Sequence, residues 1–338
     1  PTVTDADLVL GYLDAANYAG GSIPLNPKRS LFAIEEALCD DLDVEVIEAA
    51  LLVKEKVDSN MANGVNTELR VRGYDPEDFT MLAYGGNGPL HCCGIASNLN
   101  IDRILATPMS SVFSAVGAGN MHQMHIHESS LFMVLYDSTS RKVFDNYKRF
   151  NDIVAELSLR GQNDLLRQGS NADDIKHSLE LDMRYGNQLV QTTVVVPKHS
   201  LKSVMDVMNI LDQFSTDYGK RFGEGSQAPE AGIRINTIRV ASYVEHDTVK
   251  FTHIKPVPES ERIAPPSPSS TRTCYFVGGG GKGVETPVWN KADIPAGTQI
   301  VGPGLVASEV TTYLIEPGWK YVSAEQGAVW FLRAEAKN

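Results

Sequence analysis

Apolar residues between positions 31 and 72 recur at intervals of three and four. This spacing runs through LFAIEEALCDDLD and VEVIEAALLVKEKVDSNMANGVNTELRVR, and it predicts two amphipathic helices because it gathers apolar side chains on one face. The stretch GYDPEDFT predicts a turn, since a proline disfavours helix at the residue before it. The segments that follow predict a strand in FTMLAYG, a helix in PLHCCGIASNL, a strand in RILATP and a helix in SVFSAVGAGNM.

The pattern changes after residue 128. A strand-like SSLFMVLYD precedes a long helical pattern, and HSLELDMRYGNQLVQTTVVVP and IRINTIRVASYVE alternate with period two, on either side of a second helical pattern. Pro and Ser are frequent in KPVPESERIAPPSPSSTR, which indicates a linker or surface loop, and short strands with Gly and Pro turns follow. We therefore expect three segments: 1–128, a mixed α/β region at 129–255, and a linker with a small β-rich module at 256–338.

Composition and charge limit the number of domains, the classes of binding partner and the cellular compartment that we expect. The 338 residues are enough for two or three domains, and the net charge of −12 disfavours nucleic acid and anionic membranes as partners. The chain has no apolar run of about 18 residues and no secretory pattern. Its four cysteines form no CxxC pair, so we expect a cytoplasmic protein.

A glycine-rich turn, Gly85, Gly86, Asn87 and Gly88, separates the predicted strand FTMLAYG from a helix. Glycine lets backbone amides approach a ligand closely, and the start of a helix adds partial positive charge. The pattern predicts a nucleotide-binding turn. A tight connection without a ligand is the alternative.

The order of apolar strand, Gly-Gly, helix, strand and small-residue helix resembles the adenosine segment of actin-like and sugar-kinase-like ATPases. More specifically, PTVTDADLVLGYL, SNMANGV, RGYDPEDFTMLAYGGNGPLH and SVFSAVGAG resemble consecutive signatures of the hydantoinase A and 5-oxoprolinase family. LDMRYGNQ and GPGLVASEVTTYLIEPGWKY are similar to its C-terminal signatures. The resemblance implies an α/β fold, half of an actin-like (ASKHA) ATPase lobe followed by a mixed α/β and β-rich C-terminal region.

Members of this family usually carry a further N-terminal portion with the other ATPase lobe and its phosphate loops, and this chain resembles their C-terminal half. We therefore expect that it does not hydrolyse ATP alone. A separate subunit, or a longer precursor, would supply the partner lobe.

The family contains ATP-dependent ketone carboxylases for acetone or acetophenone, which are multi-subunit enzymes, and the resemblance is closest to one of their subunits. It implies ATP and Mg as cofactors, with phosphorylation activating the ketone enol or bicarbonate. It also implies a hydantoinase B-like subunit and a small accessory subunit as partners, and any Zn or Mn would lie on another subunit.

Two alternatives remain open. The family also contains ATP-dependent cyclic amidases of the 5-oxoprolinase and N-methylhydantoinase type. A structural scaffold whose glycine turn binds no nucleotide is the second alternative.

Arg184 and Gln188 in DMRYGNQ are our candidates for substrate binding. The planar fork of an arginine suits a carboxylate or bicarbonate. The alternative is a structural ion pair between Asp182 and Arg184. No catalytic residue is identified.

Two further patterns favour structural roles. His125 and His127 would share one face of a strand, as two metal ligands do, but nearby ligands to complete a set are lacking, and we predict a polar strand. In FVGGGGKG, Lys282 precedes Gly283 rather than Ser or Thr, so we predict a hairpin tip instead of a phosphate loop.

The residues Cys92, Cys93 and Asp5 lie near predicted helix starts, and each allows a structural and a functional interpretation. Cys92 and Cys93 open a helix, where the dipole lowers a thiol pKa, but buried packing is the favoured interpretation. Asp5 is interpreted as the cap of a helix beginning at Ala6. The alternative for Asp5 is contact with the partner lobe or a magnesium ion.

Overall fold

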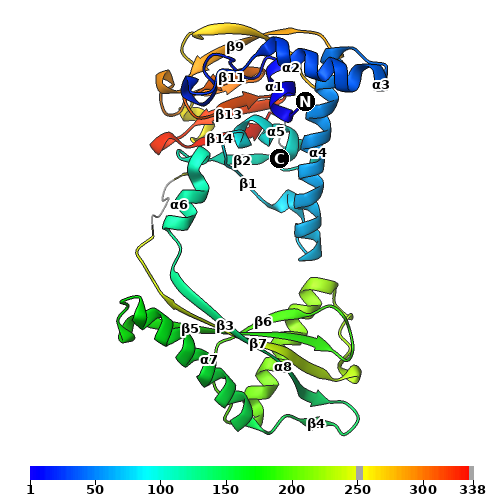
Figure 1. Ribbon diagram of the computed structural model, residues 1–338, viewed down its shortest axis with the longest axis vertical. Helices are drawn as coiled ribbons and strands as arrows, with labels where there is room; N and C mark the ends of the chain where they lie inside the picture. The colour runs from blue at the N-terminus through cyan, green and yellow to red at the C-terminus, as the bar shows by residue number, and fades with distance from the viewer. Residues whose placement is uncertain (249–253, 335–338) are drawn as a thin grey trace. The chain divides into compact units, whose positions relative to one another are not determined.

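The computed structural model describes residues 1–248 and 254–334, and the chain forms two compact units (Figure 1). The first unit comprises Pro1–Gly119 and Lys250–Asn338, and the second comprises Asn120–Val249.

The first unit contains a five-stranded sheet built from both ends of the chain, in the order β1-β2-β14-β13-β10. Its strands are β1 (Met81–Ala83), β2 (Arg103–Ala106), β10 (Gln299–Val301), β13 (Trp319–Ser323) and β14 (Val329–Arg333). β1 and β2 are parallel, and the helix between them, α5 (Gly88–Asn98), provides the crossover that parallel strands need. β14 pairs antiparallel with β2, which places Phe331 opposite Ile104.

A four-stranded sheet in the order β12-β11-β9-β8 completes the strands of this unit. They are β8 (Ser270–Cys274), β9 (Val284–Asn290), β11 (Gly304–Ala307) and β12 (Thr312–Ile315). β8 and β9 are antiparallel neighbours joined by the FVGGGGKG segment. The hairpin predicted for that segment is therefore confirmed.

The helices of the first unit begin with α1 (Val3–Val9). The others are α2 (Pro27–Ile34), α3 (Asp40–Leu42), α4 (Val46–Val71), α5 and α6 (Phe113–Gly119), and one π-helical turn joins α2 to α3. The predicted amphipathic helices are thus confirmed. Asp5 does help cap a helix, but that helix starts at Val3 rather than Ala6, and Asp5 forms a capping box with Thr2.

The second unit is a two-layer α/β sandwich with sheet order β4-β3-β7-β5-β6. Its elements are β3 (Gln123–Asp137), β4 (Lys142–Val143), α7 (Tyr147–Arg167), β5 (Ile175–Tyr185), β6 (Thr192–Val196), α8 (Val204–Phe222) and β7 (Ile233–Val244). Alternate residues of the strands pack with residues of both helices in one core, so α7 and α8 cover the same face of the sheet. No described helix of the chain is long and apolar enough to cross a membrane.

These units differ from the three segments expected from sequence. Residues 256–338 lie in the same unit as the N-terminal segment because β14 hydrogen-bonds to β2. In addition, β3 runs without interruption across the expected boundary at residue 128. Local patterns do not reveal either feature, since both depend on long-range strand pairing.

Gly11 provides a test of how the two ends of the chain are joined in the first unit. It has a φ of +83°, and a Cβ at this position would lie 2.2 Å from the carbonyl oxygen of Thr273 in β8. We expect Gly11→Ala to lower the free energy of unfolding by about 3 kcal/mol in urea denaturation, from left-handed strain plus overpacking.

Gly318→Ala is the matched control. Gly318 has the same φ, but a Cβ there would meet no atom within 4 Å, so only the backbone strain of about 1–2 kcal/mol should appear. Equal losses for the two variants would contradict the close contact between Gly11 and β8.

Candidate functional site

The turn formed by residues 85–88 leads from β1 into α5 and exposes backbone to its surroundings. Gly85 has a φ of +88°, which favours glycine, and its amide donates to the Ser110 carbonyl over 2.6 Å. The Gly88 amide donates to the Gly85 carbonyl over 3.3 Å. Within residues 1–248 and 254–334, the amides of Gly86 and Asn87 donate to no acceptor. Two donors of the predicted nucleotide turn are thus available to a ligand.

Open space lies where Gly85 and Gly86 would carry a side chain. A Cβ on Gly85 would meet no atom within 4 Å, and one on Gly86 would meet only a backbone oxygen, at 3.8 Å. The Thr311 hydroxyl donates to the Gly86 carbonyl over 2.6 Å, which holds a neighbouring loop against the turn. Among the described residues, no side chain therefore fills the space beside Gly85 and Gly86.

A cavity of about 260 Å³ lies beside this turn, and Gly86 and Asn87 form part of its wall. The rest of the wall comes from the segment after α1 and from the 307–312 loop, with Leu13, Asp14, Asn17, Tyr18, Ala19, Ile23, Ala307, Ser308, Glu309, Val310, Thr311 and Thr312 as lining residues. The predicted turn is therefore part of a concave site within the first unit.

A second, larger cavity of about 730 Å³ shares Asp14, Asn17 and the 307–311 loop with the first. Two cationic side chains line it. Arg272 forms an ion pair with Asp14 at 3.4 Å, and the Lys291 ammonium donates to the Tyr313 hydroxyl over 2.6 Å. Cations beside open backbone amides suit an anionic ligand.

Sequence reasoning missed a buried ionic network around α5. Asp58 on α4 accepts hydrogen bonds from both Lys54 and His91, and its distance to His91 Nδ1 is 2.8 Å. The second nitrogen of His91 lies 3.3 Å from a carboxylate oxygen of Asp7 on α1. Lys54 also contacts Glu316, after β12, at 3.1 Å. The network therefore ties α5 to α1, to α4 and to the segment after β12.

Four of the charged side chains in this network are almost completely buried, so each of them needs an oppositely charged partner. Lys54 is 1% exposed, Asp7 0%, Asp58 3% and His91 4%, and charges removed from water must be paired. Gly94 on α5 permits the contact, because a Cβ there would lie 2.0 Å from a carboxylate oxygen of Asp58. The only sequence signals were a Lys and an Asp four residues apart in α4 and one His in an otherwise apolar helix start.

The pKa of His91 reflects two opposing influences. Burial disfavours the charged imidazolium and lowers the pKa, but the carboxylates of Asp58 and Asp7 outweigh it and raise the pKa to about 9. The imidazolium is therefore the favoured form at neutral pH. For Lys54, burial also lowers the pKa, and the charges of Glu316 and Asp58 raise it further than burial lowers it.

Arg184 and Gln188, the substrate-binding candidates, lie together in the second unit. The Arg184 guanidinium donates to the Gln188 carbonyl over 3.0 Å, and the Tyr218 hydroxyl donates to the Gln188 side chain over 3.0 Å. The alternative ion pair of Asp182 with Arg184 does not form, because Asp182 pairs with Arg239 at 3.0 Å instead.

The histidine pattern has a structural explanation. His125 and His127 lie on β3, as predicted, and His127 Nε2 lies 2.9 Å from Asp164 of α7. His125 Nε2 is buried without a hydrogen-bond partner. Among the described residues, no three His, Cys, Asp or Glu side chains converge as a metal site requires.

Cys92 and Cys93 are both buried in the core beside the sheet of the first unit. The predicted packing role is therefore confirmed. The alternative of a lowered thiol pKa is wrong for Cys93, because burial raises its pKa.

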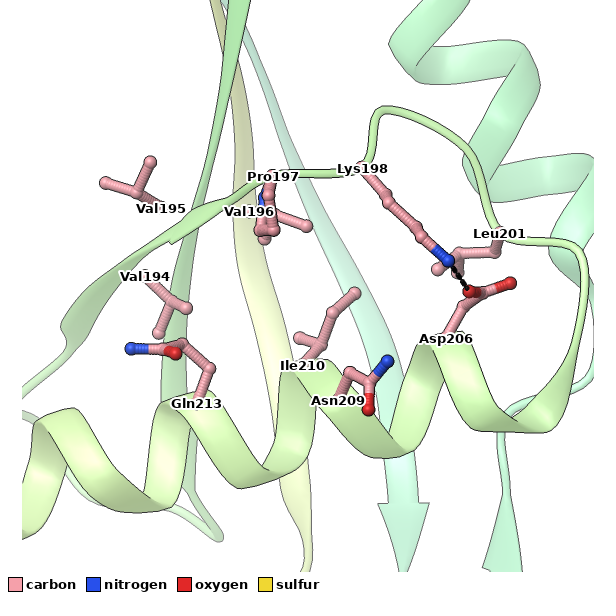
Figure 2. Close-up of a pocket in the computed structure, with 10 residues that line it drawn as sticks. All are labelled: Val194, Val195, Val196, Pro197, Lys198, Leu201, Asp206, Asn209, Ile210 and Gln213. Atoms are coloured by element: carbon pink, nitrogen blue, oxygen red, sulfur yellow. Dashed lines mark hydrogen bonds and ion pairs between the residues drawn. The ribbon is translucent and has the colours of Figure 1, made fainter.

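Figure 2 shows a further cavity, of about 260 Å³, between β6 and α8 of the second unit. Val196, Leu201 and Ile210 line it and belong to the core of this unit. An ion pair of Lys198 with Asp206 at 2.9 Å lies at one end, and the lysine lowers the pKa of that carboxyl. None of the sequence-predicted site residues lines this cavity.

The buried network predicts a pH-dependent stability. The pKa of His91 is about 9 in the folded chain and about 6.5 in an unfolded one. Its contribution, on the order of 3 kcal/mol, should be complete below pH 6.5 and be lost as the pH rises through 9. We expect His91→Gln to destabilise the chain at pH 6 and to flatten the loss between pH 6.5 and 9 in urea denaturation.

His246→Gln serves as the control, since His246 is exposed. It should leave the pH profile unchanged. A wild-type profile that stays flat through pH 9 would contradict the assigned pairing of His91.

Two family models match the sequence. The hydantoinase/oxoprolinase model matches residues 1–127, and the hydantoinase/oxoprolinase C-terminal domain model matches residues 137–326. Together they cover most of both units.

Curated relatives extend this similarity. The gamma subunit of acetophenone carboxylase from Aromatoleum aromaticum is 33% identical over 321 residues, covering 94% of this chain and 42% of the relative. The alpha subunit of caprolactamase from Pseudomonas jessenii is 26% identical over 336 residues, covering 98% of this chain and 46% of the relative. The chain thus spans less than half the length of these relatives.

Two solved structures share the fold. A nucleotide-free acetone carboxylase superimposes with a TM-score of 0.70 at 22% identity, covering 98% of this chain and 46% of that one. The ATP-dependent caprolactamase from Pseudomonas jessenii gives a TM-score of 0.79 at 24% identity, covering 99% and 47%. These matches confirm the expected α/β fold, and the family models show that the chain belongs to the hydantoinase/oxoprolinase family.

Proposed function

We propose that this chain supplies one side of an adenine-nucleotide site in a multi-subunit, ATP-dependent ketone carboxylase. The observation that carries the proposal is a pair of amides, at Gly86 and Asn87, that donate to no acceptor among the described residues and lie on the wall of a cavity. The similarity to the acetophenone carboxylase gamma subunit supports the choice of enzyme class.

The residues present fit such a ligand. Backbone amides at the start of a helix donate to phosphate or ribose oxygens, and the absence of a Cβ at Gly86 lets the ligand approach. Arg272 and Lys291 line the adjoining cavity and offer positive charge, while Asp14 offers a carboxylate suited to magnesium.

Each part of the chain then has a distinct role. The glycine turn binds and orients the nucleotide, and the buried network holds α5, and with it the turn, in a fixed position. Bound ATP would supply the phosphoryl group that activates the ketone enol or bicarbonate. Because a bilobal site needs two sides, a second polypeptide segment carrying the phosphate-binding lobe would complete it.

Further subunits and the substrate groups belong to the same proposal. A hydantoinase B-like subunit and a small accessory subunit would complete the enzyme, which would act in the cytoplasm. Arg184 and Gln188 remain candidates for binding the bicarbonate or the acid product.

A cyclic amidase is the second candidate function. The observation in its favour is structural, because the TM-score to the caprolactamase is 0.79 and that to the acetone carboxylase is 0.70. Sequence identity favours the carboxylase, with 33% to the acetophenone carboxylase subunit.

Substitution of Gly86 tests the nucleotide site. In the complex with the subunits that co-purify with the chain, we expect Gly86→Val to weaken ATP binding at least about tenfold, because two methyl groups occupy the ligand's path. Isothermal titration calorimetry measures the dissociation constant.

Gly64→Val is the matched control. Gly64 is an exposed residue of α4 with no atom near its Cβ position, so this variant should bind ATP like the wild type. Unchanged affinity in Gly86→Val would instead favour a scaffold that binds no nucleotide.

Labelled bicarbonate distinguishes the two enzyme classes. With acetophenone, ATP and labelled bicarbonate, the complex should incorporate label into an acid product, detected by mass spectrometry. Ring-opened product from a cyclic amide, without label in any acid, would decide for the amidase.

A further inference from the structure

Two arginines lie opposite each other on neighbouring strands of the second unit. Arg184 of β5 is in register with Arg234 of β7, and directly opposed Cβ atoms in such pairs are about 4.5–5.5 Å apart. Their neighbours Met183 and Ile235 are buried in the core under α7 and α8. Since successive side chains alternate, both arginines project from the other face of the sheet.

Neither guanidinium has an acidic partner among the residues that the structure describes. Within the described part of the chain, no carboxylate forms an ion pair with Arg184 or Arg234. Arg184 donates through one terminal nitrogen to the Gln188 carbonyl, while its Nε is buried without a hydrogen-bond partner. Arg234 lies over the Phe132 ring, 4.9 Å from its centroid. This contact uses the face of the guanidinium and leaves the N–H groups at the edge of the guanidinium able to donate to a ligand.

The same sheet neutralises another arginine completely. Arg239, also on β7, forms three ion pairs, at 3.3 Å to Glu128, 3.2 Å to Glu180 and 3.0 Å to Asp182. The nearby carboxylates are therefore committed to Arg239. Residues of like charge at directly opposed positions destabilise a sheet, so an anion bound by both Arg184 and Arg234 would offset their repulsion.

We propose that Arg184 and Arg234 form an oxyanion site that binds a planar carboxylate or bicarbonate. The planar donor fork of a guanidinium suits a planar oxyanion. On Arg184, Nη2 is available beside the Nη1 that donates to Gln188, and Arg234 offers the N–H groups at the edge of its guanidinium. The site is inferred from the register of Arg184 with Arg234 and from the lack of an acidic partner for either among the described residues. Its assignment to bicarbonate or an acid product rests on the proposed function.

Anion-dependent thermal unfolding of the full chain tests the site. Sodium bicarbonate and sodium benzoate are titrated at constant ionic strength with sodium chloride as the balancing salt. A ligand that binds only the folded state raises the Tm progressively with its concentration. We expect both salts to raise the Tm of the wild type, and Arg234→Gln to abolish this rise.

The direction of the Tm change that Arg234→Gln causes in chloride alone distinguishes a ligand site from a structural role. In chloride alone, Arg234→Gln should raise the Tm, because it removes the repulsion with Arg184. A structural arginine would instead lower the Tm when replaced. Arg234→Lys keeps the charge without the planar fork, so it should retain the repulsion and lose most of the response to bicarbonate and benzoate.

Lys176→Gln is the matched control. Lys176 is a cation on β5 that is already paired with Glu245 at 2.5 Å, so its replacement should leave the response to bicarbonate and benzoate intact. A response that survives in Arg234→Gln, or a Tm in chloride that falls in this variant, would overturn the proposal. A stronger response to phosphate than to benzoate would overturn the assignment to planar oxyanions.

The outcome is independent of the nucleotide site, because the titration contains no ATP. A wild-type chain that responds to bicarbonate, in a complex that fails to bind ATP, would reject the proposed function and leave this site standing. The opposite result would reject only this site.

Discussion

The shared carboxylate of Asp58 is the interaction on which the candidate site depends. It binds Lys54 of its own helix and His91 of α5, and it can do so only because Gly94 brings no Cβ into the contact. Glu316 and Asp7 complete the pairing of the two cations. Buried charges are costly unless each is paired, so the positions of α1, α4, α5 and the segment after β12 constrain one another. Because the glycine turn leads directly into α5, its position is fixed by the same contacts.

The sequence predicted the features that depend on short-range patterns. Helical periodicity located α4 and α7, and the glycine run marked the turn before α5. The remaining features depend on long-range contacts. Asp7, His91 and Glu316 are far apart in the chain, and the opposition of Arg184 and Arg234 is set by strand register. No local pattern encodes these pairings, and the alternative Asp182–Arg184 ion pair does not form for the same reason, since Asp182 pairs with Arg239 of a neighbouring strand.

The two units treat charge in contrasting ways. In the first, the cations Lys54 and His91 are enclosed by acidic side chains, which fixes the backbone around them. In the second, one arginine attracts three carboxylates, and two others lack an acidic partner among the described residues. Full pairing produces rigidity, whereas incomplete pairing leaves a local charge that a small anion neutralises. A count of charged residues alone cannot distinguish these situations, because it contains no information about neighbours in space.

The pairing of β14 with β2 has a consequence for folding during synthesis on the ribosome. The second unit is continuous in the chain, whereas the first is interrupted by it. During synthesis, β2 emerges before the entire second unit, and its antiparallel partner β14 is made only after that unit. The inserted unit can therefore complete its own core while β2 still presents an unpaired edge, an arrangement that exposes the nascent chain to mispairing and makes shielding by chaperones valuable.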